Sequence, residues 1–173
     1  ETLHLCMHEH YEDCPWREQS LYAMDSRNQM LCGYYAFGEY DFPRANLELI
    51  SKDNREDGFL SICYPMQLDL VIPSFSLHYL TACREYLQYS NDIAFLREIY
   101  PKLESILNTF VGTGGDGDLQ DPLTDISCDH SFSPFLNLPV LMLLLHFLPF
   151  LHTDALRRHH LYRYLLKLPP LEG

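Results

Sequence analysis

The fold of this chain is decided by the stretch Asp13-Cys14-Pro15-Trp16-Arg17-Glu18-Gln19-Ser20-Leu21-Tyr22-Ala23-Met24-Asp25. Pro15 suits the first position of a helix, because its missing N–H is not needed there and its φ is already helical. Asp13 or Cys14 then lies at the cap, where an Asp accepts from the free amides of the first turn. We therefore predict a helix over residues 15–37. One face of that helix carries, at spacings i, i+4 and i+7, Glu18, Tyr22 and Asp25.

Three carboxylates stand in this stretch at spacings of five and seven residues: Asp13, Glu18 and Asp25. Together with the Tyr22 ring near the start of the helix, these carboxylates could bind a sugar ring. Acids near a helix start also complement the helix dipole, whatever the protein does. Asp13, Arg17 and Glu18 are equally typical of a solvated salt-bridge face. Spacing alone leaves both interpretations open.

The residue types favour the first interpretation. The run Asp13-Cys14-Pro-x-Arg17-Glu18, with Asp25 seven residues after Glu18, resembles the acidic motif of bacterial α-L-rhamnosidases. Those enzymes are inverting glycoside hydrolases whose catalytic domain is an (α/α)6 barrel of six helical hairpins. The similarity covers about two-thirds of the chain and fades after Phe110; its further segments are Asn28-Gln29, Gly33-Tyr34-Tyr35, residues 72–77 and Tyr100-Pro101-Lys102-Leu103. The resemblance implies an all-α fold, a partial (α/α)6 six-hairpin barrel. The residues themselves predict that a short extended N-terminal segment precedes it.

The resemblance also implies roles for single residues. Glu18 matches the general acid, and no cofactor or metal is implied. The expected substrate-binding residues around the rhamnose are Asp13, Asp25, Arg17, Trp16 and Tyr22. A general acid must stay protonated near neutral pH, which nearby anions promote by raising a carboxyl pKa. An inverting enzyme also needs a basic carboxylate about 6.5–9.5 Å away, and this sequence shows no counterpart for it.

Chain length accounts for the missing base. Twelve helices of about 11–12 residues each, plus loops, exceed the 173 residues present, and the chain begins without Met. We therefore expect residues 1–173 to be a single incomplete catalytic domain, a fragment or truncated product that is inactive alone. Residues 111–173 would form a divergent loop and two apolar or amphipathic helices. The substrate of the whole would be a glycoside with a terminal α-L-rhamnosyl group.

Composition is that of an ordinary globular segment. Apolar residues make up 47% and charged residues 21%, close to soluble averages. The formal net charge of −12 repels phosphate backbones, so nucleic acid is excluded as a partner. The aromatic content of 13% suits sugar stacking and equally suits a large helical core.

Six cysteines are scattered along the chain, several within apolar helical patterns. This is not a dense disulfide framework, so we expect buried free thiols and a reducing, cytoplasmic compartment. A metal site built from nearby ligands is the alternative for Cys6, His8, His10 and Cys14. The spacing is not H-E-x-x-H and no second ligand pair completes it. Alternation of polar and apolar residues over 2–10 predicts an extended segment instead.

Further helices are predicted over residues 43–54, 74–90 and 92–111, packed as antiparallel hairpins with short connections. Residues 59–64 are predicted to be short and extended, and residues 111–129 form a Gly-rich loop. The apolar stretch over 134–151 is interrupted at Asn137, Pro139, His146 and Pro149. A membrane span needs about 20 apolar residues, so we expect a buried helix, no membrane, and a final amphipathic helix over 152–167.

A second function class is compatible with the same residues. If partner helices are absent, the segment over 134–151 exposes an apolar surface that favours association. The alternative to a glycosidase fragment is therefore a non-catalytic helical protein that self-associates through its apolar faces.

Overall fold

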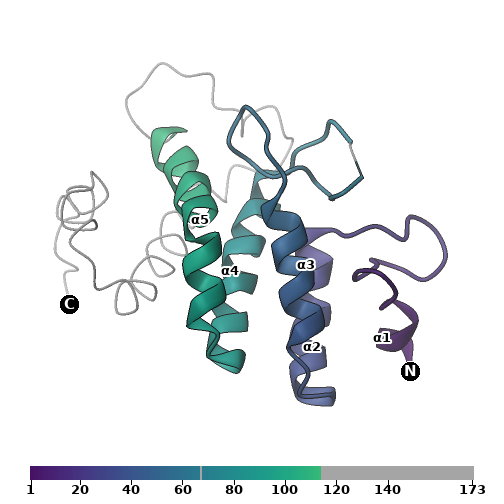
Figure 1. Ribbon diagram of the computed structural model, residues 1–173. Coiled ribbons are helices and arrows are strands. Elements are labelled where there is room, and N and C mark those ends of the chain that lie inside the picture. Colours follow the sequence, from purple (N-terminus) through teal and green to yellow (C-terminus); the bar gives the residue numbers. More distant parts are fainter. Residues whose placement is uncertain (67, 114–173) are drawn as a thin grey trace, which may run out of the picture. The chain divides into compact units, whose positions relative to one another are not determined.

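The computed structural model describes residues 1–66 and 68–113, in which the regular structure is helical (Figure 1). The helices, in chain order, are α1 (Thr2–Leu5), α2 (Ala23–Ala36), α3 (Asp41–Ser51), α4 (Pro73–Ser90) and α5 (Ile93–Thr113). The predicted all-α class is confirmed. Among the described residues, no helix is both long and apolar enough to cross a bilayer.

The four longer helices of this part alternate in direction and form two layers (Figure 1). Helices α3 and α5 lie in front in that view, with α2 and α4 behind them, and α4 and α5 form a tight antiparallel hairpin. The most extensive helix packing joins α2 to α4. Because these two helices run in the same direction, their N-terminal ends lie at the same end of the array.

The predicted hairpin over 74–90 and 92–111 is confirmed, and its ends follow from local chemistry. Pro73 opens α4 in its first turn, and Asn91 ends it in the left-handed conformation at φ 56°. Asp92 then caps α5, because its Oδ1 accepts from the Phe95 amide at 3.0 Å. Asn tolerates the left-handed region better than most residues do, and Asp is a favoured N-cap.

Helix α3 begins two residues earlier than predicted, at Asp41 rather than residue 43. The Glu39 Oε1 accepts from the amides of Asp41 and Phe42, at 2.6 and 2.9 Å. A carboxylate at a helix start satisfies free amides and complements the dipole. Pro43 therefore sits inside the first turn, where its missing N–H costs no hydrogen bond.

The core lies between the two layers. Its largest fully buried side chains include Met30 of α2, Leu47 of α3, Tyr79 and Leu80 of α4, and Phe95, Leu103 and Ile106 of α5. Tyr79 satisfies its hydroxyl by donating to the Leu47 carbonyl oxygen at 3.1 Å. A bidentate ion pair joins α2 to α4: Arg27 Nε and Nη2 donate to the two carboxylate oxygens of Glu85 at 2.9 and 2.7 Å.

The N-terminal segment differs from the extended prediction. Thr2–Leu5 form the short helix α1, followed by bends and a single antiparallel bridge between Met7 and Tyr11. The His4 ring stacks on Phe37 at 4.4 Å between ring centroids, which ties α1 to the end of α2. Polar–apolar alternation over a few residues cannot distinguish a strand from one helical turn. The contact between His4 and Phe37 favours the helical conformation.

The helix predicted over 15–37 begins late, at Ala23. Residues 15–18 form a turn, and Gln19 then takes a positive φ of 51°. A continuous right-handed helix cannot pass through that conformation. Glu18, Tyr22 and Asp25 therefore do not share one helix face, and the i, i+4, i+7 prediction is wrong. Any proximity of these side chains comes from how the loop folds.

The cysteines of the described part are free, with Cys6, Cys63 and Cys83 buried, Cys14 half-buried and Cys32 exposed. The predictions for residues 114–129, 134–151 and 152–167, and for Cys128, lie outside the described residues.

Candidate active site

The candidate site is a closed loop that leads into α2. At its base, the Asp13 amide donates to the Ser20 carbonyl at 3.1 Å, and the Ser20 amide donates back to Asp13 Oδ1 at 3.0 Å. The Ser20 hydroxyl donates to the Glu18 carbonyl at 3.0 Å. These contacts bring residue 13 next to residue 20 and make 14–19 a compact loop rather than a helical turn continuing into α2.

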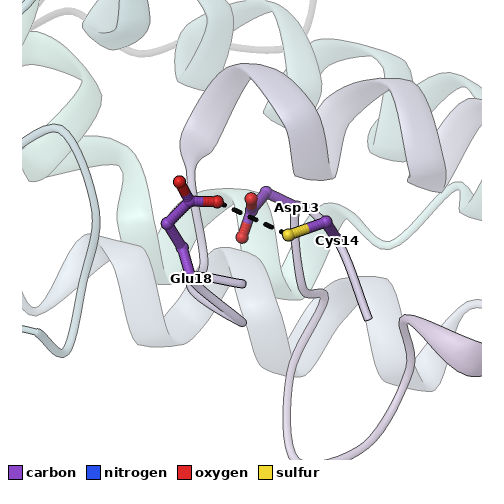
Figure 2. A group of neighbouring side chains, drawn as sticks. All are labelled: Asp13, Cys14 and Glu18. Atoms are coloured by element: carbon purple, nitrogen blue, oxygen red, sulfur yellow. Dashed lines mark hydrogen bonds between the residues drawn. The ribbon is translucent and has the colours of Figure 1, made fainter. Parts of the chain in front are cut away.

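Within this loop, the side chains of Asp13, Cys14 and Glu18 lie together (Figure 2). One polar atom from each lies within 4.8 Å of the other two. Cys14 Sγ donates to Glu18 Oε2 at 3.4 Å and accepts from the Arg17 amide at 3.4 Å. The predicted capping position is therefore held by Cys14, whose sulfur caps the single turn over 15–18.

The end of the loop is held against a distant segment. The Tyr64 amide donates to the Leu21 carbonyl at 3.2 Å, and Tyr22 forms an antiparallel bridge with Cys63. The Tyr22 ring meets Phe75 of α4 edge-on, with centroids 6.4 Å apart. The segment predicted to be extended over 59–64 thus supplies the pairing surface that holds Tyr22.

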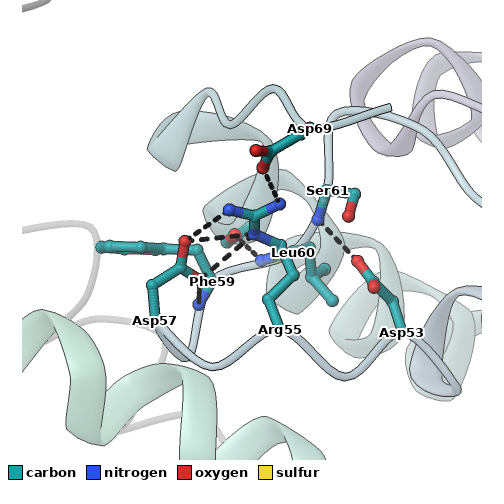
Figure 3. Close-up of polar contacts among 8 residues, drawn as sticks. Asp53, Arg55, Asp57, Phe59, Leu60, Ser61 and Asp69 are labelled. Carbon is teal, nitrogen blue, oxygen red and sulfur yellow. Dashed lines mark hydrogen bonds and ion pairs between the residues drawn. The ribbon is translucent and has the colours of Figure 1, made fainter. Parts of the chain in front are cut away.

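That segment belongs to the long connection between α3 and α4, which is braced by charged contacts (Figure 3). The Arg55 guanidinium donates to Asp57 at 2.7 Å and to Asp69 at 3.0 Å. Asp53 Oδ2 accepts from the Ser61 amide at 2.5 Å, and Lys102 of α5 donates to the Asp53 carbonyl. These contacts tie residues 53–61 of the connection to Asp69 and to α5.

The pKa values of Asp13 and Asp25 are shifted in opposite directions. Burial disfavours ionisation of Asp13, but hydrogen bonds from the Ser20 amide and from Cys14 and Glu18 outweigh it, so the pKa of Asp13 lies below its ordinary value. The pKa of Asp25 is raised, chiefly by burial and further by the negative charges of Asp13 and Glu18. Asp25 therefore lies within electrostatic reach of both, although the loop and not a shared helix face brings them together.

His78 of α4 faces the same region. Burial lowers its pKa, as does the positive charge of Arg27, while Glu85 and Asp25 oppose the shift. A histidine that is neutral near pH 7 can hydrogen-bond a neighbour without adding a charge. Sequence reasoning missed His78, because nothing in its sequence neighbourhood signals the tertiary proximity to Asp25.

The remaining predicted site residues differ in exposure. Trp16 is 89% exposed and the Arg17 side chain 76% exposed, so both project from the loop. Tyr22 is half-buried against Phe75. Glu18 is exposed, with Arg17 Nη2 at 3.5 Å from its Oε1. Solvent therefore reaches the carboxyl that the resemblance assigns to acid catalysis.

The four-residue metal alternative from the sequence is not assembled. His8 Nδ1 pairs with Glu12 Oε1 at 2.7 Å, and His10 Nδ1 contacts the Tyr11 carbonyl at 3.0 Å. Within the described part, a different set of potential ligands gathers, namely Asp13, Cys14 and Glu18. Their hydrogen bonds to one another and to the backbone already account for this grouping.

Comparison with known proteins identifies the family. The model of the bacterial alpha-L-rhamnosidase 6 hairpin glycosidase domain matches residues 1–130, so the chain belongs to this family. The structure resembles the crystal structure of the GH78 family rhamnosidase of Bacillus sp. GL1, with a TM-score of 0.64 and 32% identity, covering 66% of this chain and 12% of that one. Comparison with curated protein sequences gives no match.

A second solved structure is similar over more of the chain. It is the rhamnosidase from Klebsiella oxytoca with rhamnose bound, with a TM-score of 0.62 and 25% identity, covering 84% of this chain and 35% of that one. The present chain thus spans far less than two-thirds of either protein. The predicted family and the all-α six-hairpin class are both confirmed.

Proposed function

We propose that this chain contributes the general acid, Glu18, and the residues around it to the active site of an α-L-rhamnosidase. The observation that carries this is the grouping of Asp13, Cys14 and Glu18 within 4.8 Å, in a loop that leaves Glu18 open to solvent. A general acid must reach the leaving oxygen of a bound glycoside, and an exposed carboxyl at a loop tip can do so.

In this mechanism the three carboxylates have separate tasks. Glu18 donates its proton to the glycosidic oxygen as the bond to the sugar breaks. Asp13, which the Ser20 amide helps to keep ionised, accepts a hydrogen bond from a sugar hydroxyl and stabilises positive charge on the reacting carbon. Asp25 and Tyr22 border the sugar from the start of α2, and Arg17 and Trp16 contact it from the loop.

Hydrolysis with inversion requires a second carboxylate about 6.5–9.5 Å from the acid to activate water. We assign that base to a part of the six-hairpin barrel outside residues 1–173. The chain matches only 12% and 35% of the lengths of the two rhamnosidases it resembles, which supports this assignment. We expect the chain alone to bind a rhamnoside weakly and to hydrolyse it negligibly.

The test compares leaving groups. In the complete protein, Glu18→Gln should lower kcat about 10²–10⁴-fold on a rhamnoside whose alkyl leaving group needs protonation. The loss should be much smaller on a nitrophenyl rhamnoside, because that leaving group departs as an anion. Equal losses on both substrates, or none, would remove Glu18 from acid catalysis.

The alternative function is self-association without catalysis. Large apolar side chains are exposed on the described part, among them Leu5, Trp16, Tyr35 and Leu70. Sedimentation of residues 1–173 over a range of concentrations distinguishes the two functions: a concentration-dependent oligomer without rhamnoside binding would favour association.

A further inference from the structure

The Glu18 carboxyl lies on a loop that offers it few restraints. Its side chain is 41% exposed, and its ion-pair partner Arg17 is 76% exposed, with Nη2 at 3.5 Å from Oε1. Such an exposed pair contributes little, because solvent screens it and both long side chains remain mobile. The direction of the carboxyl must therefore be set by something else, since a general acid works only from a defined position.

Cys14 is placed to supply that restraint. Its S–H donates to Glu18 Oε2 at 3.4 Å (Figure 2). Its sulfur also accepts from the Arg17 amide at 3.4 Å. The neighbouring Asp13 is fixed to Ser20 through both its amide and its carboxylate. The thiol is thus anchored to the backbone of the turn on one side and contacts the reactive carboxyl on the other.

We propose that Cys14 is a positioning residue that sets the orientation of the Glu18 carboxyl. This proposal rests on the proposed role of Glu18 as general acid. The S–H of Cys14 contacts Oε2 of Glu18 at 3.4 Å and thereby limits rotation of the carboxyl relative to the loop.

The contact itself can be tested on residues 1–173 without any activity. Iodoacetamide alkylation is followed residue by residue by peptide mass spectrometry. We expect Cys14 to react faster in Glu18→Ala than in the unaltered chain, because this variant removes the side chain that accepts from the S–H and lies against the sulfur. Exposed Cys32 is the internal control, and Glu56→Ala, which removes an exposed carboxylate elsewhere, should leave the Cys14 rate unchanged. An unchanged Cys14 rate in Glu18→Ala would overturn the contact.

The positioning role is tested by kinetics in the complete protein. Cys14→Ala removes the donor, and we expect kcat on the alkyl rhamnoside to fall about 3- to 10-fold, the range for one lost hydrogen bond. The nitrophenyl rhamnoside should be nearly unaffected. Cys14→Ser keeps both a donor and a good cap, and should restore kcat on the alkyl substrate. In Glu18→Gln, adding Cys14→Ala should cause no further loss.

These outcomes separate the two proposals. Equal losses on both substrates in Cys14→Ala would show that the sulfur only caps the turn, which overturns the positioning role. A normal kcat for Cys14→Ala beside a slow Glu18→Gln would overturn it while leaving Glu18 as the acid. If Glu18→Gln itself shows no dependence on the leaving group, the acid assignment fails, and the alkylation result still reports whether the contact exists.

Discussion

Asp13 and Ser20 are joined twice, once through the Asp13 amide to the Ser20 carbonyl and once through the Ser20 amide to the Asp13 carboxylate, at 3.1 and 3.0 Å. This double link turns a sequence that favours a helix start into a closed loop. It also commits Oδ1 of Asp13 to the protein.

Removing this link should destabilise the chain in a graded way. Asp13→Ala deletes the acceptor of the Ser20 amide, and we expect the free energy of unfolding to fall by about 1–3 kcal/mol. Asp13→Asn keeps a carbonyl oxygen for the same amide and should lose distinctly less. Urea unfolding followed by circular dichroism measures both. A loss for Asn as large as for Ala would show that the charge, rather than the hydrogen bond, closes the loop.

Acid should weaken the fold through carboxylates that are stabilised when ionised. The Phe95 amide lowers the pKa of Asp92 most strongly, with support from Tyr86 and Arg44 against the effect of burial. A depressed folded-state pKa means that this stabilisation is complete above the ordinary value of about 3.9 and is lost as pH falls through the folded value. Asp92→Asn keeps a good N-cap but cannot titrate. Its unfolding free energy should therefore change less between pH 5 and pH 2.5, and an identical slope would contradict the assignment.

The ion pair between Arg27 and Glu85 should contribute measurably, because it lies between the two most closely packed helices. The two side chains are only 23% and 14% exposed. Glu85→Gln leaves a half-buried guanidinium without its charged partner, and we expect a loss of about 2 kcal/mol. Lys52→Gln is the control, since its i, i+4 pair with Glu48 is solvent-exposed and should contribute under about 0.5 kcal/mol. Equal effects in thermal unfolding would count against the structural role of Arg27.

Two glycines with positive φ provide a matched test of packing: Gly58 lies in the α3–α4 connection, and Gly38 lies between α2 and α3. Gly58 has φ 80°, and a Cβ there would lie 2.2 Å from Thr109 Oγ1, whereas Gly38 at φ 61° has nothing within 4 Å. Gly38→Ala should cost about 1 kcal/mol from backbone strain alone. Gly58→Ala should cost more, because Thr109 must also move. If chemical unfolding finds the two variants equal, the close approach of Gly58 to α5 is absent in solution.

Asp25 should affect the proposed reaction differently from Glu18. Its proposed partner is the sugar itself, so Asp25→Asn in the complete protein should weaken binding and lower kcat for alkyl and nitrophenyl rhamnosides alike. Steady-state kinetics on the two substrates, compared with Glu18→Gln, separates these roles. A loss confined to the alkyl substrate would instead place Asp25 in proton transfer.

The helical hairpin over α4 and α5 could be predicted because its signals are local. Pro73 fits a first helical turn, Asp92 caps the next helix, and apolar residues recur at helical spacing between them. The acidic motif could also be recognised from the sequence, because it is defined by residue types at short spacings. The family comparison confirms the resemblance drawn from Asp13, Cys14, Arg17, Glu18 and Asp25.

The start of α2 could not be predicted, because tertiary contacts override the local signals. Pro15 favours a helix from residue 15, yet the Asp13–Ser20 link and the pairing of Leu21 and Tyr22 with residues 63–64 hold the chain in a loop until Ala23.

The sequence by itself therefore determined the helical class and which carboxylates are present. Tertiary structure decided how those carboxylates are arranged: a closed loop, rather than one face of a helix, gathers Asp13 and Glu18, and both lie within electrostatic reach of Asp25. The physical reason is that hydrogen bonds between residues far apart along a segment satisfy backbone groups as well as a helix does, and only the folded surroundings select between them.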